Sequence, residues 1–274
     1  MHKEADGRTL KVGIAVLGTV GKSLATSLDQ TLPSVELVAV AARNAQAAKE
    51  WLARLTTQPK VVGFDAMAEM CDVVIECAPP HLLPEIAVPV LTAGKELVVL
   101  SCGGLLHRPE LIELAETHGG RIHVPTGALL GLDAVAAAAE GEITSVKMVT
   151  RKPLKGLQGA PFLKEQGISI DQIAERTLVF SGSAREAIKG FPANLNVAVA
   201  LSLAGIGPDR TMLEIWADPE ITRNMHTITV ESDAAMFSMS IENIPTDNPK
   251  TGRITAQSVS ALVRKLSAPL RVGT

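Results

Sequence analysis

A chain of 274 residues is long enough for two domains of modest size. With 46% hydrophobic and 20% charged residues it can bury a core, which excludes extensive disorder. Its net charge is −3 and no run of lysine or arginine occurs, which argues against nucleic acid or an anionic membrane as a partner.

The three cysteines and the absence of tyrosine limit the kinds of site and mechanism that the chain can use. Cys71, Cys77 and Cys102 are odd in number and lack C-x-x-C spacing, which favours free thiols in a reducing cytoplasm over a disulfide frame or a zinc site. The histidines have no ligand spacing, so we expect no metal. No stretch reaches the roughly 18 uninterrupted apolar residues that a membrane-spanning helix needs. The chain has no tyrosine, which excludes a tyrosine general acid.

The first half alternates between two patterns. Apolar runs predict buried strands at 12–18, 35–43, 71–80, 95–104 and 121–128. Helical spacing predicts helices at 21–30, 45–55, 82–94 and 109–120. This alternation predicts an α/β fold with a Rossmann-type, doubly wound parallel sheet that binds a ligand at the carboxyl ends of its strands. We place this dinucleotide-binding domain at 1–128.

From about residue 142 the pattern changes to a second, α+β domain, which we place at 129–252. Strand-like runs lie at 143–153, 176–184, 210–219, 225–232 and 236–245, and helical segments at 168–177 and 184–205. The resulting antiparallel-rich sheet could serve as a subunit interface, so we expect a homodimer or a higher homo-oligomer. The amphipathic C-terminal segment, 253–274, is expected to pack back on the first domain.

The stretch KVGIAVLGTVGKSLA has the form of a dinucleotide-binding turn, G-x-G-x-x-G, between a strand and a helix. Gly18 and Gly21 occupy its second and third glycine positions, and Val16 replaces the first. The second glycine lets the backbone approach a pyrophosphate and the third allows close packing of helix on strand. We therefore assign Gly18, Thr19, Val20 and Gly21 to the cofactor. The alternative is a plain strand–helix turn.

The end of the second predicted strand bears on the choice of cofactor. An acidic residue there suits the ribose hydroxyl of NAD, whereas an arginine suits the 2′-phosphate of NADP. This chain has Arg43 and Asn44 and no acid, which favours NADP or the use of both cofactors. The alternative is that Arg43 is only a solvated charge at a helix entry.

Five motifs together resemble the L-aspartate dehydrogenase family, in order and over nearly the whole chain; Val16 is the main departure. They are PTGALLGLDA (125–134), TRKPLKGLQGAP (150–161), FPANLNVAVALSLAG (191–205), DPEITRNMHTITV (218–230) and NPKTG (248–252).

The resemblance implies oxidation of L-aspartate to iminosuccinate with hydride transfer to NAD or NADP. Hydrolysis of the imine then gives oxaloacetate and ammonia, and the reverse reaction is reductive amination. It also implies that His226 is the active-site histidine and that Ala128 and Asn196 contact the nicotinamide half of the cofactor.

The residue types also indicate which side chains could bind the substrate. A dicarboxylate that carries an amine needs cations or amide donors and a group that handles a proton near neutral pH, for which histidine is suited. We assign Arg151, Lys152 and Asn224 to substrate binding, although the Arg151–Lys152 pair could equally be solvated. Asp218 could orient His226 or merely open a turn.

Two other functions remain open on the sequence. One is a related oxidoreductase for another small amino or hydroxy acid, similar to homoserine dehydrogenase, in which comparable glycine turns occur. The other is a regulator that binds NADP without catalysis, against which the intact His226 and Asn196 argue.

Overall fold

The computed structural model describes residues 9–31, 34–192, 195–246 and 252–274. The chain divides into two compact units. The first contains residues 1–125 and 256–272, and the second contains residues 126–255 and 273–274. The sequence places these limits nearby, at 128 and 252, although Ala128 itself lies in the second unit.

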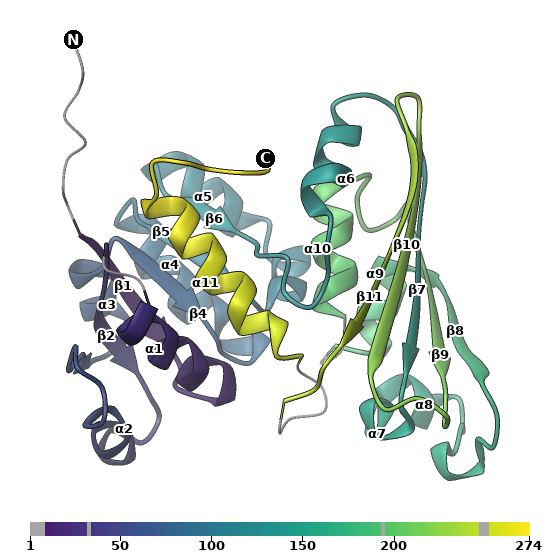
Figure 1. Cartoon of the computed structure of the whole chain (residues 1–274), viewed down its shortest axis with the longest axis horizontal. Coiled ribbons are helices and arrows are strands. Elements are labelled where there is room, and N and C mark those ends of the chain that lie inside the picture. Colours follow the sequence, from purple (N-terminus) through teal and green to yellow (C-terminus); the bar gives the residue numbers. More distant parts are fainter. Residues whose placement is uncertain (1–8, 32–33, 193–194, 247–251) are drawn as a thin grey trace. The chain divides into compact units, whose positions relative to one another are not determined.

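The first unit is built on a six-stranded parallel sheet in the order β3-β2-β1-β4-β5-β6. This is the predicted doubly wound fold (Figure 1). Its strands are β1 (Leu10–Ala15), β2 (Val35–Ala41), β3 (Lys60–Val61), β4 (Val73–Glu76), β5 (Glu96–Val99) and β6 (Arg121–His123). Its helices are α1 (Thr19–Thr31), α2 (Ala45–Leu52), α3 (Phe64–Met70), α4 (Leu83–Thr92), α5 (Glu110–His118) and α11 (Ile254–Ser267), with 3₁₀ turns at Pro80–Leu82 and Cys102–His107.

Both faces of this sheet are covered by helices. On one face, Leu24 of α1 and Val259 of α11 join a buried cluster with Ile14 of β1. Helices α1 and α11 lie side by side, and Ser27 Oγ is 3.1 Å from Ser260 Oγ (Figure 1). On the other face α3 packs so closely that a Cβ at Gly13 would lie 2.8 Å from the Met67 side chain. The C-terminal helix therefore belongs to the core of the first unit.

The second unit contains a five-stranded mixed sheet in the order β11-β10-β7-β9-β8. Its strands, all predicted, are β7 (Ile143–Lys152), β8 (Thr177–Ser183), β9 (Thr211–Ala217), β10 (Asn224–Ser232) and β11 (Met236–Asn243). The pairing is antiparallel except between β7 and β9. Its helices are α6 (Leu132–Ala139), α7 (Leu154–Leu157), α8 (Pro161–Glu165), α9 (Ala184–Gly190) and α10 (Asn196–Ala204).

One helix prediction in this unit was wrong, and a second was confirmed only as two shorter helices. Segment 168–177 forms only a single 3₁₀ turn, Ile170–Gln172, and none of its side chains is buried, so no packing stabilises a helix there. Segment 184–205 is two helices because Pro192 disfavours helical geometry at Phe191. The alanine-rich helix α6 was missed. Among the described residues, no helix is both long and apolar enough to span a membrane.

Candidate active site

The glycine turn lies at the carboxyl edge of the parallel sheet. Ala15, the last residue of β1, is in register with Ala41 on β2 and with Glu76 on β4, so these strands end together. Helix α1 begins at Thr19 without an acidic residue in its first turn. Its N-terminal N–H groups and the positive end of its dipole therefore offer a site for an anionic group such as a phosphate.

The two glycines differ in what surrounds them. At Gly18 an added Cβ would meet no atom within 4 Å, so the backbone there is open to approach. At Gly21 an added Cβ would lie 2.5 Å from the carbonyl oxygen of Val16, so helix and strand pack too closely for any side chain. These environments match the roles expected of the second and third glycines, and the turn fits a dinucleotide.

Val16 occupies the turn at a backbone φ of +76°, in the left-handed region that favours glycine. Its N–H donates to the Ala41 carbonyl, 3.1 Å away, which holds the bend in place. A β-branched residue in this conformation is strained by about 1–3 kcal/mol. The turn is formed in spite of this strain.

We expect Val16→Gly to raise the free energy of unfolding by about 1 kcal/mol, because relief of strain exceeds the extra chain entropy of glycine. Cofactor affinity should change by less than about tenfold, or ~1.4 kcal/mol, because the fold already holds the turn in the required shape. Chemical denaturation and a cofactor titration measure the two quantities. A much larger gain in affinity would show that Val16 impairs the natural turn.

Arg43 and Asn44 follow β2 at the same edge, and both are exposed. The Asn44 Oδ1 accepts the N–H of Ala47 at 3.0 Å and caps helix α2. Asn44 therefore caps a helix, whereas the Arg43 side chain is exposed at the same edge of the sheet.

In the second unit, buried polar side chains gather on one face of the sheet. His226 on β10 lies directly opposite Thr150 on β7, and His226 Nδ1 is 3.1 Å from Thr150 Oγ1. Because side chains alternate along a strand, Asn224 and Lys152 share this face. The exposed fractions are 3% for His226, 0% for Thr150, 3% for Lys152 and 8% for Asn224. Burial of so many polar groups together is costly and typical of a functional site.

His226 does not titrate near neutrality, contrary to the reasoning from its residue type. Burial, together with the nearby Lys152 cation, lowers the pKa of His226 to about 3. The imidazole is therefore neutral at physiological pH.

Arg151 and Asp218 are brought together, but not with His226. Arg151 points to the opposite face of the sheet, where its Nε donates to Asp218 Oδ2 at 3.0 Å. The Asp218 Oδ1 accepts the N–H of Glu220 at 3.0 Å, so Asp218 opens the turn after β9. Burial raises the pKa of Asp218, but the bonds from Arg151 and Glu220 outweigh it and hold that pKa below its usual value.

Ala128 and Asn196 lie in the same unit. Ala128 is in a turn in which Gly127 has a φ of +62° and the Leu129 N–H donates to the Thr126 carbonyl. The Ala128 carbonyl also accepts a hydrogen bond of 2.9 Å from Asn243 Nδ2. Asn196 begins α10 and is half-buried. The NPKTG motif lies largely outside the described residues.

Sequence reasoning missed Thr150 and Asn243. Strand alternation places Thr150 on the face of Lys152, so that signal was present in the sequence. The register that places Thr150 opposite His226 could not be predicted from the sequence, because it depends on which strands pair.

The comparisons with known proteins agree with this architecture. Residues 133–266 match the family described as aspartate dehydrogenase, C-terminal, and residues 17–125 match that described as homoserine dehydrogenase, NAD binding domain. The first unit is therefore an NAD-binding domain, and the residues that match the homoserine dehydrogenase family lie within it.

Proteins that match over the whole chain also indicate aspartate dehydrogenase. The chain is 57% identical to L-aspartate dehydrogenase 3 of Bordetella bronchiseptica, over 97% of this chain and 98% of the relative. It is also 57% identical to L-aspartate dehydrogenase of Bradyrhizobium diazoefficiens, over 100% and 98%. The crystal structure of aspartate dehydrogenase from Thermotoga maritima has the same fold, with a TM-score of 0.71, 22% identity and coverage of 96% and 99%. The chain belongs to the L-aspartate dehydrogenase family, a family of oxidoreductases.

Proposed function

We propose that the chain catalyses the reversible, NAD(P)-dependent oxidation of L-aspartate to iminosuccinate, which water converts to oxaloacetate and ammonia. The observation that carries the proposal is the buried face with His226, Thr150, Lys152 and Asn224, which lies in the region matched to aspartate dehydrogenases. The cofactor supplies the acceptor for the hydride that leaves the α-carbon.

The residues of this face have separate tasks in the proposal. The ammonium of Lys152 pairs with a substrate carboxylate, and the amide of Asn224 adds a hydrogen bond. With Nδ1–H donating to Thr150 Oγ1, the imidazole of His226 keeps a lone pair on Nε2 for a proton from the substrate amine. Burial is the main cause of the lowered pKa of His226, and a carboxylate beside Lys152 also balances the second cause, the lysine cation.

The residues assigned to the cofactor hold its two halves in the proposal. Gly18, Thr19, Val20 and Gly21 present the first turn of α1 to the pyrophosphate. Ala128 and Asn196 are proposed to contact the nicotinamide half, as the family resemblance implies.

The experiment follows absorbance of NADPH or NADH in mixtures of protein, oxaloacetate and ammonium, with homoserine and malate as control substrates. We expect cofactor consumption that requires both oxaloacetate and ammonium. Turnover of homoserine instead would favour the related dehydrogenase, and tight NADPH binding without any turnover would favour a sensor.

For the cofactor we propose that NADPH is used at least as well as NADH. Arg43→Ala should then weaken NADPH binding by about 1–3 kcal/mol, the value of a charged hydrogen bond, and leave NADH binding nearly unchanged. Parallel titrations of the two cofactors measure this. An equal loss for both would show that Arg43 does not recognise the 2′-phosphate.

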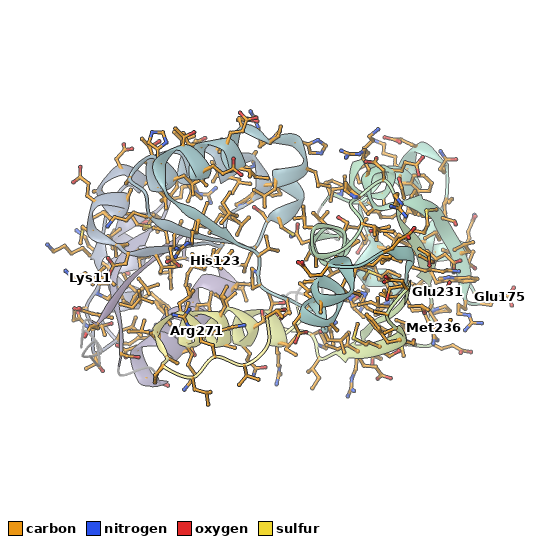
Figure 2. All side chains as sticks on the ribbon, turned by 90° about the horizontal axis from the view of Figure 1, so that it is seen from above. Lys11, His123, Glu175, Glu231, Met236 and Arg271 are labelled. Atoms are coloured by element: carbon orange, nitrogen blue, oxygen red, sulfur yellow. The ribbon has the colours of Figure 1, made fainter. Side chains whose placement is uncertain are left out.

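We further propose that the chain forms a homo-oligomer through the sheet of the second unit. Among the described residues, helices cover only one face of this sheet (Figure 1). The other face carries Met212, which is 46% exposed, and the half-buried Val149, Trp216 and Met225. In Figure 2, Glu231 and Met236 mark the β10–β11 hairpin at the end of this sheet.

Sedimentation should give the mass of two or more chains, and Met212→Glu should lower it because a charge replaces an apolar contact. A monomer at micromolar concentration would contradict the proposal. A cytoplasmic location is proposed as well, supported by the three cysteines, none of which forms a disulfide.

A further inference from the structure

Glu76, the last residue of β4, is a carboxylate inside the first unit with an exposed fraction of 0%. The Ala78 N–H donates to its Oε1 at 2.5 Å. Its Oε2 accepts from the Leu100 N–H at 3.1 Å, the Ser101 N–H at 2.9 Å and the Ser101 hydroxyl at 2.8 Å. No lysine, arginine or histidine of the described residues is among these partners.

The geometry of these contacts favours the ionised carboxylate. Burial raises the pKa of Glu76, and the hydrogen bonds from Ser101, Ala78 and Leu100 offset part of that rise. Backbone N–H groups can only donate, and both carboxylate oxygens already receive them. Of these partners only the Ser101 hydroxyl could accept a proton from a neutral carboxyl, whereas the three N–H groups pair with acceptor oxygens alone. With three backbone N–H donors on its two oxygens, the ionised form of Glu76 is a buried negative charge whose hydrogen-bond donors are all neutral.

The position of this charge follows from the topology. The strand order 3-2-1-4-5-6 consists of two mononucleotide-binding halves, which meet between β1 and β4. In a fold of this kind the adenosine half of the cofactor binds toward the end of β2, and the nicotinamide half therefore toward β4 and β5, which lie on the other side of β1 in the sheet. Glu76 ends β4 in register with Val99 on β5, at the carboxyl edge where the ligand binds.

We infer that Glu76 is a specificity residue whose negative charge favours the oxidised cofactor, with its cationic nicotinamide ring, over the reduced cofactor with its neutral ring. The inference rests on the proposed binding of NAD(P) but not on the identity of the substrate. By stabilising the oxidised form on the protein, Glu76 shifts the bound couple toward hydride donation and hence toward reductive amination.

The test compares dissociation constants of oxidised and reduced cofactor, by calorimetry without substrate, for the unaltered protein and Glu76→Gln. The variant removes the charge and keeps the size of the side chain. We expect the preference for the oxidised form to fall by about tenfold, because the charge acts on one redox state of the ring and not on the other. Glu96→Gln, at the opposite end of β5, should leave the ratio unchanged.

Ser101→Ala distinguishes the effect of the negative charge from the effect of the local hydrogen bonds, because it removes one donor and keeps the carboxylate. It should change both affinities alike and leave their ratio as it was. If Glu76→Gln weakens both forms equally, the carboxylate only holds the loops after β4 and β5, and the inference is wrong.

A second measurement does not depend on the folding of the variant. The unaltered protein is titrated with NAD⁺ and with an analogue in which a neutral benzamide ring replaces the nicotinamide ring. We expect NAD⁺ to bind several-fold more tightly, and equal affinities would overturn the inference. Absence of binding by any of these nucleotides would overturn it together with the proposed function, whereas binding without turnover of aspartate would remove the function alone.

Discussion

Replacement of His226 by alanine is expected to lower kcat by about 10²–10⁴, the usual effect of losing a general acid–base group. The imidazole is buried, neutral and fixed by Thr150, which leaves one nitrogen for the substrate amine. Cofactor affinity should stay near that of the unaltered protein, because the glycine turn belongs to the other unit. Steady-state turnover and a cofactor titration of the same preparation measure both quantities.

Thr227→Ala is the matched control. Thr227 is the next residue on β10, and its side chain points to the opposite face, where its Oγ1 lies 2.9 Å from Ser240 Oγ. This variant should retain nearly full turnover. Near-normal turnover of His226→Ala, or equal losses in the two variants, would remove His226 from the mechanism.

The second large effect is expected at the glycine turn. Gly21→Ala places a methyl group 2.5 Å from the Val16 carbonyl oxygen, which is backbone and cannot move without displacing α1 or β1. We expect the free energy of unfolding to fall by about 2–4 kcal/mol, as for an overpacked core site, and cofactor affinity to fall with it. Chemical denaturation and cofactor titration measure the two effects.

Gly18→Ala provides the contrast at the same turn, because its Cβ would meet no protein atom within 4 Å. Its stability should be nearly unchanged, while cofactor affinity should fall about tenfold or more, or ~1.4 kcal/mol, since the methyl group occupies the approach of the pyrophosphate. If Gly21→Ala is as stable as the unaltered protein, or if Gly18→Ala binds cofactor normally, the assignment of the two glycines is wrong.

The first unit could be predicted well because its signals are local. Buried parallel strands such as Val73–Glu76 are short apolar runs, and most are followed by a helix with its own spacing. The two-residue strand β3 and the helix α3 after it were missed. The strain at Val16 could not be predicted, because φ depends on how the strand meets the helix. The sequence shows only that a glycine is missing.

The second unit was less predictable because its site is assembled by strand pairing. The sequence identified His226 but could not show that Thr150 lies opposite it, or that burial beside Lys152 lowers the pKa of His226. Arg151 and Lys152 are adjacent in sequence, and strand alternation separates them onto two faces. Segment 168–177 has helical spacing, but without burial that spacing has no effect.

The most direct test of the proposed function follows the nitrogen atom. Protein, oxaloacetate, ¹⁵N-ammonium and NADPH are mixed, and the products are identified by mass spectrometry and chiral chromatography. The account predicts L-[¹⁵N]aspartate in equal amount to the NADPH consumed, with little malate. Consumption of NADPH with malate as the product, or no labelled aspartate with an active and cofactor-bound protein, would contradict it.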